Sequence, residues 1–187
     1  AYNTAVGFYA GIGITTGIQN TLIGGLAGDA LNTGQENIAI GYQALTADTK
    51  GKYSVAVGNN ALAAQNFTTA TSVFNTAVGY DAGNDITTGV ENTLIGGLAG
   101  DALTDADSNV AVGYAALSAD TLGSRSTAIG RGTLINQNFT TATEADNTAV
   151  GYNAGIAVTT GIRNTLIGAI AGDALTDADS NVAVGRA

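Results

Sequence analysis

A five-residue motif, Asn-Thr-Ala-Val-Gly or a close variant, recurs along the whole chain and constrains its fold more than any other feature. Its final glycine stands at Gly7, Gly24, Gly41, Gly58, Gly79, Gly96, Gly113, Gly130, Gly151, Gly168 and Gly185. The position number rises by 17 from one glycine to the next, as from Gly7 to Gly24, except that every fourth step is 21, as from Gly58 to Gly79. A unit of this length is too short for a helical repeat, which takes about 33 residues or more, but it suits one turn of a β-solenoid.

Four units form a longer repeat, in which Gly7, Gly79 and Gly151 are equivalent. The segment NTLIGGLAGDAL at 20–31, for example, returns unchanged at 92–103. We therefore treat residues 1–187 as a single repeat domain, and because the chain begins and ends inside the motif we expect it to be part of a longer array. The super-repeats run at about 3–74, 75–146 and, in part, 147–187.

The unit length predicts an all-β, parallel β-solenoid built from 17- and 21-residue coils. Segments such as Val110-Ala111-Val112 are short, β-branched and closed by Gly, which is typical of strands that end at a bend. We expect two short strands and two turns in each coil, with successive coils about 4.8 Å apart. The Val or Ile before each motif Gly should point into the coil. The Ala that stands three places after most of these glycines should mark a close approach of two backbones.

Asparagine stands four positions before the motif glycine in every unit except two, where Ser54 and Ser126 take its place. Stacking would put these amides in one column, in which each can donate to and accept from its neighbours. We predict a structural ladder, and not a ligand site, at Asn20, Asn37, Asn75, Asn92, Asn109, Asn147 and Asn164.

Tyrosine follows the motif glycine at Tyr42, Tyr80, Tyr114 and Tyr152. Other units carry residues such as Phe, Arg, Asn or Gly at this place, a mixture that indicates a surface position. A surface tyrosine combines a rigid apolar ring with a polar hydroxyl group, so it can contact a sugar or a protein. Covering the neighbouring coil is its alternative role.

The loop sequence Thr-Asp-Ala-Asp-Ser-Asn occurs at 104–109 and again at 176–181. D-x-D-x-N matches half of a calcium-binding loop, but the glycine and the distal glutamate of a complete EF-hand are missing. A turn stabilised by Asp side chains explains the same loop. The candidate calcium ligands are Asp105, Asp107, Asp177 and Asp179, and no other cofactor is expected.

The chain has 15 acidic and 6 basic residues, a net charge of −9, and neither His nor Cys. The acidic balance disfavours nucleic acid and anionic membrane surfaces as partners. No apolar run approaches the ~18 residues of a membrane span, so we expect no membrane insertion. Paired carboxylates occur only in repeated turns, and we therefore expect no enzymatic activity.

The segments NTAVGYDAG, NIAIGYQAL and SVAVGNNAL resemble the head repeats of trimeric autotransporter adhesins and the similar repeats of phage tail fibres. The resemblance covers the whole chain, although the 17- and 21-residue units are longer than the usual adhesin head repeat. It implies a left-handed β-roll, a parallel homotrimer, and attachment to a host-cell receptor or glycan from a virion or bacterial surface outside the cell. It also gives the Ala column and Leu22 a place at the subunit interface.

These observations favour a non-catalytic structural or adhesive fibre segment. A shaft that only spaces other domains shares the fold, and the sequence does not separate it from a receptor-binding segment. An ice-binding solenoid needs Thr in register on consecutive coils, whereas pairs such as Thr15-Thr16 recur only every fourth coil. A glycan-processing enzyme with its site between chains would have to use carboxylates such as Asp105.

Overall fold

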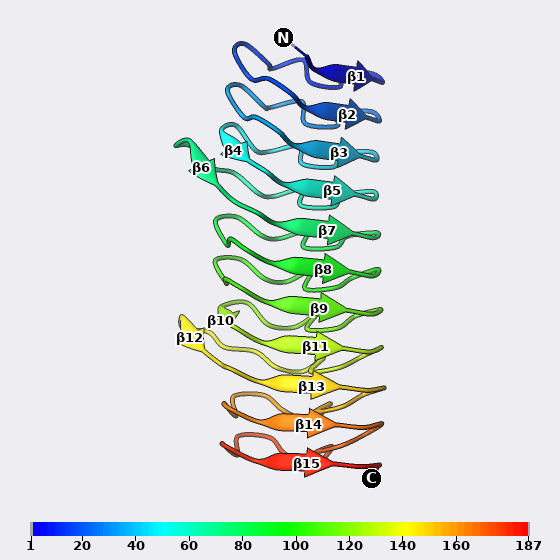
Figure 1. The fold of residues 1–187 in the computed structure, drawn as a ribbon, viewed down its shortest axis with the longest axis vertical. Helices are drawn as coiled ribbons and strands as arrows, with labels where there is room; N and C mark the ends of the chain where they lie inside the picture. Colours follow the sequence, from blue (N-terminus) through cyan, green and yellow to red (C-terminus); the bar gives the residue numbers. More distant parts are fainter. Residues whose placement is uncertain (1, 187) are drawn as a thin grey trace.

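The chain folds into one stack of coils, with its two ends at opposite ends of the stack (Figure 1). The computed structural model describes residues 2–186, which contain fifteen strands and no helix. Eleven of the strands form a single parallel sheet that runs the length of the stack. This confirms the all-β, parallel solenoid with a 17-residue spacing. The sheet contains β1 (Thr4–Val6), β2 (Thr21–Ile23), β3 (Ile38–Ile40), β5 (Val55–Val57), β7 (Thr76–Val78), β8 (Thr93–Ile95), β9 (Val110–Val112), β11 (Thr127–Ile129), β13 (Thr148–Val150), β14 (Thr165–Ile167) and β15 (Val182–Val184).

The strand register keeps every motif aligned with the next. Most paired residues are 17 apart, as in Ile38 with Val55, but β5 pairs with β7 and β11 with β13 at a separation of 21. The additional residues leave the stack as two loops that project beyond the other coils (Figure 1). Each loop is held by a two-stranded parallel pair, β4 (Gly51–Lys52) with β6 (Thr71–Ser72) and β10 (Gly123–Ser124) with β12 (Thr143–Glu144).

The central residue of each three-residue strand points into the coil and the two flanking residues point outward. In β8, Leu94 is fully buried, whereas Ile95 is 40% exposed. The expectation that the Val or Ile before each glycine lies in the interior is therefore wrong. Side chains alternate across a strand, and because Ala or Leu occupies the inner position, the next residue must face outward.

The coil interior is filled by two columns whose side-chain sizes complement each other. Where the strand carries Leu22, the facing position is Gly28, and a Cβ there would lie 2.8 Å from Leu22 Cδ2. Where the strand carries Ala39, the equivalent position is Leu45, which is fully buried. Where both positions are small, as at Ala77 and Gly83, leucines of the neighbouring coils fill the space: a Cβ on Gly83 would lie 2.7 Å from Leu94 Cδ1 and 3.1 Å from Leu62 Cδ2. The placement of Leu22 and the Ala column at a subunit interface is wrong, because Leu22 and Ala27 are fully buried within one chain.

The expected second strand is absent from most coils of the described residues. The second and fourth residues after the motif glycine have positive φ, as in Leu26 at 59° and Gly28 at 54°. Extended strands need negative φ, so this segment forms a series of turns instead. A second strand in a coil occurs only at β4, β6, β10 and β12 within residues 2–186.

The motif glycines allow the coils to stack closely. A Cβ on Gly96, whose φ is +133°, would lie 2.6 Å from the carbonyl oxygen of Gly113 in the next coil. Both the positive φ and this close approach exclude a larger residue. The adjacent Gly97 has neither restriction, since the nearest atom to its Cβ position is Tyr114 Cδ2 at 3.7 Å.

We expect Gly96→Ala to lower the free energy of unfolding by about 2 kcal/mol or more, because it adds backbone strain and a steric clash. The neighbouring Gly97→Ala should change it by no more than about 0.5 kcal/mol. Chemical denaturation of both variants measures the difference. Equal losses would show that close stacking at the motif glycine does not limit stability.

Candidate functional site

The asparagine column forms a continuous hydrogen-bonded ladder inside the stack. Asn75 Oδ1 accepts hydrogen bonds from the backbone N–H of Asn92 at 2.8 Å and from Asn92 Nδ2 at 3.2 Å. Asn92 Nδ2 also donates to the carbonyl oxygen of Ala106 at 2.8 Å. Because the groups are buried and satisfied within the protein, they stabilise the stack and offer no ligand site. The same burial holds for Asn20, Asn37, Asn75, Asn92, Asn109, Asn147 and Asn164.

A glutamine from each protruding loop restores the ladder where serine replaces asparagine. Gln65 Nε2 donates to Ser54 Oγ at 3.0 Å and to Asp48 Oδ2 at 2.7 Å, and Gln65 Oε1 accepts from Asn75 Nδ2 at 3.0 Å. Gln65 and Asp48 are fully buried. The Asp48 carboxylate also accepts hydrogen bonds from the backbone N–H groups of Gly51 and Phe67. The second super-repeat repeats this network with Gln137, Asp120, Ser126 and Asn147.

The aspartates of the repeated TDADSN loop accept hydrogen bonds from residues of the preceding coil or of their own loop. Asp107 Oδ1 accepts from the backbone N–H of Val90 in the preceding coil at 2.8 Å, and Asp105 Oδ1 accepts from the Thr88 hydroxyl at 2.6 Å. Asp179 repeats the first contact with Ile162, while Asp177 accepts from the adjacent Thr176 hydroxyl. Within residues 2–186, no group of three or more His, Cys, Asp or Glu side chains is placed to hold a metal ion.

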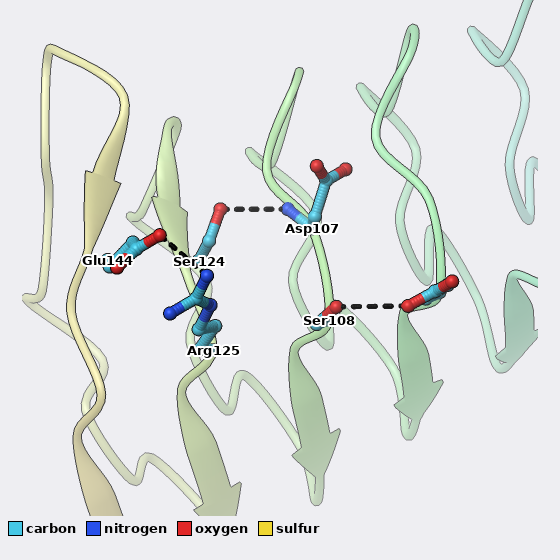
Figure 2. Close-up of polar contacts among 6 residues, drawn as sticks. Asp107, Ser108, Ser124, Arg125 and Glu144 are labelled. Atoms are coloured by element: carbon cyan, nitrogen blue, oxygen red, sulfur yellow. Dashed lines mark hydrogen bonds and ion pairs between the residues drawn. The ribbon is translucent and has the colours of Figure 1, made fainter.

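A polar hollow of about 470 Å³ lies beside the second protruding loop. Figure 2 shows Arg125 and Glu144 pointing toward one another in an ion pair of 2.5 Å, whose side chains are more than half exposed. Ser124 Oγ accepts from the backbone N–H of Asp107 at 3.0 Å, so the walls are tied to each other between coils. The hydroxyl and charged groups can hydrogen-bond a polar ligand. The lining consists of Asp105, Asp107, Ser108, Ser124, Arg125, Ala142, Thr143 and Glu144.

The equivalent corner of the first super-repeat has different chemistry. Tyr53 and Phe74 stack there with ring centroids 5.2 Å apart, where the second super-repeat has Arg125 and Asp146. The two protruding loops thus share a backbone design but present different side chains. Variation on a fixed scaffold is typical of surfaces that bind partners.

The tyrosines that follow the motif glycine are all exposed, and so is Phe8 at the same place in the first coil. The guanidinium group of Arg131 lies between two of these rings, 5.6 Å from Tyr114 and 5.9 Å from Tyr152. Such distances allow a cation–π interaction with both rings.

The outer side of the eleven-stranded sheet carries no charge. Every outward position of its strands is Thr, Val or Ile. Although the protein has a net charge of −9, none of its charged residues lies on this face. The face was not predicted from the sequence, because the Val and Ile column was expected in the interior.

Asp101 was not predicted from the sequence either. Its Oδ1 is buried and has no hydrogen-bond partner among the residues that the structure describes. Burial, together with the carboxylates of Asp85 and Asp81, raises the pKa of Asp101 to about 6. The equivalent Asp29 differs, because its Oδ1 accepts a hydrogen bond from the Thr46 hydroxyl at 2.5 Å. Stacked acidic residues at 81, 85 and 101 were the available sequence signal.

Comparisons of the chain with protein-family models, curated proteins and solved structures gave no match. Residues 2–186 include no helix of the length and apolar character needed to cross a membrane. Any assignment of function therefore rests on the surfaces described above.

Removing the Gln65 amide should destabilise the fold without altering the surface. Gln65→Ala removes the buried amide that bonds Asp48, Ser54 and Asn75, so each of the three loses one buried hydrogen bond and we expect a loss of about 2–4 kcal/mol in the free energy of unfolding. Gln19→Ala, at an exposed position, is the control and should have little effect. Urea denaturation measures both; a loss at Gln65 no larger than at Gln19 would contradict the role of the amide.

Asp101→Asn should stabilise the protein above pH 6 but not at pH 4. A raised carboxyl pKa means that the folded state holds its proton more tightly, so native stability falls as the pH rises from about 4 to about 6. Asparagine avoids this loss. The expected gain at pH 7.5 is roughly 1 kcal/mol after allowance for partial exposure. Thermal melts at both pH values test it, with Asp29→Asn as the control that should gain nothing.

Proposed function

We propose that this chain is a non-catalytic segment of an extracellular attachment fibre, in which three parallel copies with left-handed coils form a stiff rod. The observation that carries the proposal is the uncharged, β-branched outer face of the eleven-stranded sheet. At about 4.8 Å per coil, this face is roughly 50 Å long. One of its two outward columns is Val or Ile in every strand, and because single soluble proteins seldom expose a continuous apolar row of this length, the row marks an interaction site.

A second and third copy of the same chain fit the face better than an unrelated partner. The outward columns repeat the same residue types from β1 to β15, so a parallel copy meets matching chemistry at every coil. The face lacks charge, as the centres of protein interfaces do. Acidic and basic residues lie in the turns and protruding loops, where they would remain in water.

Attachment would then fall to the surfaces outside the sheet face. The polar hollow beside Arg125 and the exposed aromatic residues are surfaces of this kind. They support contact with a cell-surface receptor or glycan on behalf of a virion or a bacterial cell. A shaft that only spaces other domains would have no use for them, so binding of the isolated rod to host cells separates the two roles.

Native mass spectrometry should give the mass of three chains. The double variant Ile95→Lys/Ile129→Lys should be monomeric because it puts charge into the interface, while its far-UV circular dichroism stays unchanged because both side chains already face outward. Glu91→Lys, an exposed change in a turn, should remain trimeric. A stable native monomer would overturn the trimer.

Ice binding is the second candidate function, and a specific observation favours it. The first residue of each three-residue strand faces outward, and it is threonine in more coils than the Thr-Thr pairs occupy. Threonines of adjacent coils pair in β1 with β2, in β7 with β8 and in β13 with β14. A rigid array of Thr and Val could order water. Because this function needs the face to be exposed, it excludes the trimer. Thermal hysteresis of a monomeric preparation would support ice binding, and its absence from a trimeric one would support the fibre.

A further inference from the structure

Aromatic side chains form a regularly spaced row along one edge of the coil stack. The residue directly after the motif glycine is aromatic in every second coil for the first nine coils, and each of these side chains is 49–69% exposed. The other six coils carry Gly, Asn, Gly, Arg, Ala and Arg in turn, so most rings have no bulky neighbour beside them. The row consists of Phe8, Tyr42, Tyr80, Tyr114 and Tyr152.

The small intervening residues support the rings. Tyr42 Cδ2 lies 3.4 Å from the position that a Cβ on Gly25 would occupy, and Tyr114 has the same relation to Gly97 at 3.7 Å. Each of these rings therefore rests over the backbone of the preceding coil and leaves part of its surface in solvent. Arg131 holds the same place between Tyr114 and Tyr152. The 21-residue coils do not disturb the spacing, because their additional residues leave the stack.

Polar groups accompany the rings on the same edge. The next residue along the chain is Gln43, Asp81 or Asn153 after three of the tyrosines. Asn60 Nδ2 donates to Asp81 Oδ1 at 2.9 Å, and hydrogen bonding to Asp81 raises the pKa of Tyr80 above its usual value. Amide and carboxylate groups beside an aromatic platform supply the donors and acceptors that sugar hydroxyl groups require.

We propose that this aromatic row binds an extended, β-1,4-linked polysaccharide along the axis of the rod. Rings in alternate coils lie about 9.6 Å apart, from two steps of about 4.8 Å. This spacing is close to the length of one disaccharide in such a chain, so every second sugar can lie against a ring. The apolar face of a pyranose packs on an aromatic ring, while its hydroxyl groups point sideways to the polar neighbours. A coiled α-1,4-linked glucan cannot follow a straight row.

This inference rests on the proposed attachment function, since it names the class of glycan that the fibre contacts. Cellohexaose and chitohexaose are the probes, with maltohexaose as the coiled control, titrated calorimetrically into the intact chain in its native oligomeric state. At least one of the two β-1,4-linked probes should bind and maltohexaose should not. Tyr80→Ala/Tyr114→Ala should weaken that binding by at least about tenfold. Phe74→Ala, an equally exposed aromatic outside the row, should leave it unchanged.

The spacing itself can be tested by moving one ring. Asn59→Tyr/Tyr80→Asn keeps the composition but places two aromatics in adjacent coils and leaves a gap after them. Binding should weaken by about as much as in Tyr80→Ala alone, whereas retained affinity would overturn the role of spacing. Absence of binding to both β-linked probes, or equal binding of maltohexaose, would overturn the glycan inference. Native mass spectrometry on the same samples separates this failure from failure of the fibre proposal. A trimer that does not bind glycan would overturn the glycan inference and leave the fibre proposal standing.

Discussion

Successive coils stack with their backbones in close contact, and the other features of the molecule follow from that contact. At the motif glycine the chain passes so near the next coil that a Cβ would meet a carbonyl oxygen at 2.6 Å or less. The strand hydrogen bonds, the asparagine ladder and the filled interior all require that spacing in every layer. Four additional residues cannot be absorbed inside a layer, so they leave the stack as protruding loops.

Buried polar groups fix the register of the stack. Each asparagine from Asn3 to Asn164 bonds the next coil through both its oxygen and its nitrogen, so a shift of one residue would leave buried amides without partners. Where serine interrupts the column, Gln65 supplies the missing amide from a protruding loop. The serine and the protruding loop occur at the same place in the super-repeat, because the glutamine that replaces the missing amide comes from the loop.

The stack separates two kinds of surface, and this separation underlies the proposed function. The outer sheet face is repetitive and uncharged, which suits assembly with identical chains. The turns and protruding loops vary between super-repeats, as Tyr53 and Phe74 against Arg125 and Asp146 show. Because the scaffold does not depend on these side chains, they are free to differ and to contact other molecules.

The 17-residue period predicted the solenoid, its spacing and the place of the asparagine column, because residues one period apart lie next to each other in a stacked repeat. It did not determine which residues face inward. Leu94, which faces inward, and Ile95, which faces outward, are both apolar, so hydrophobicity could not rank them; only the volume left inside the coil did. The role of Gln65, the unpaired Asp101 oxygen and the alignment of the aromatic row were likewise decided by the tertiary structure. Each arises from residues 10 or more positions apart that meet only when the coils stack.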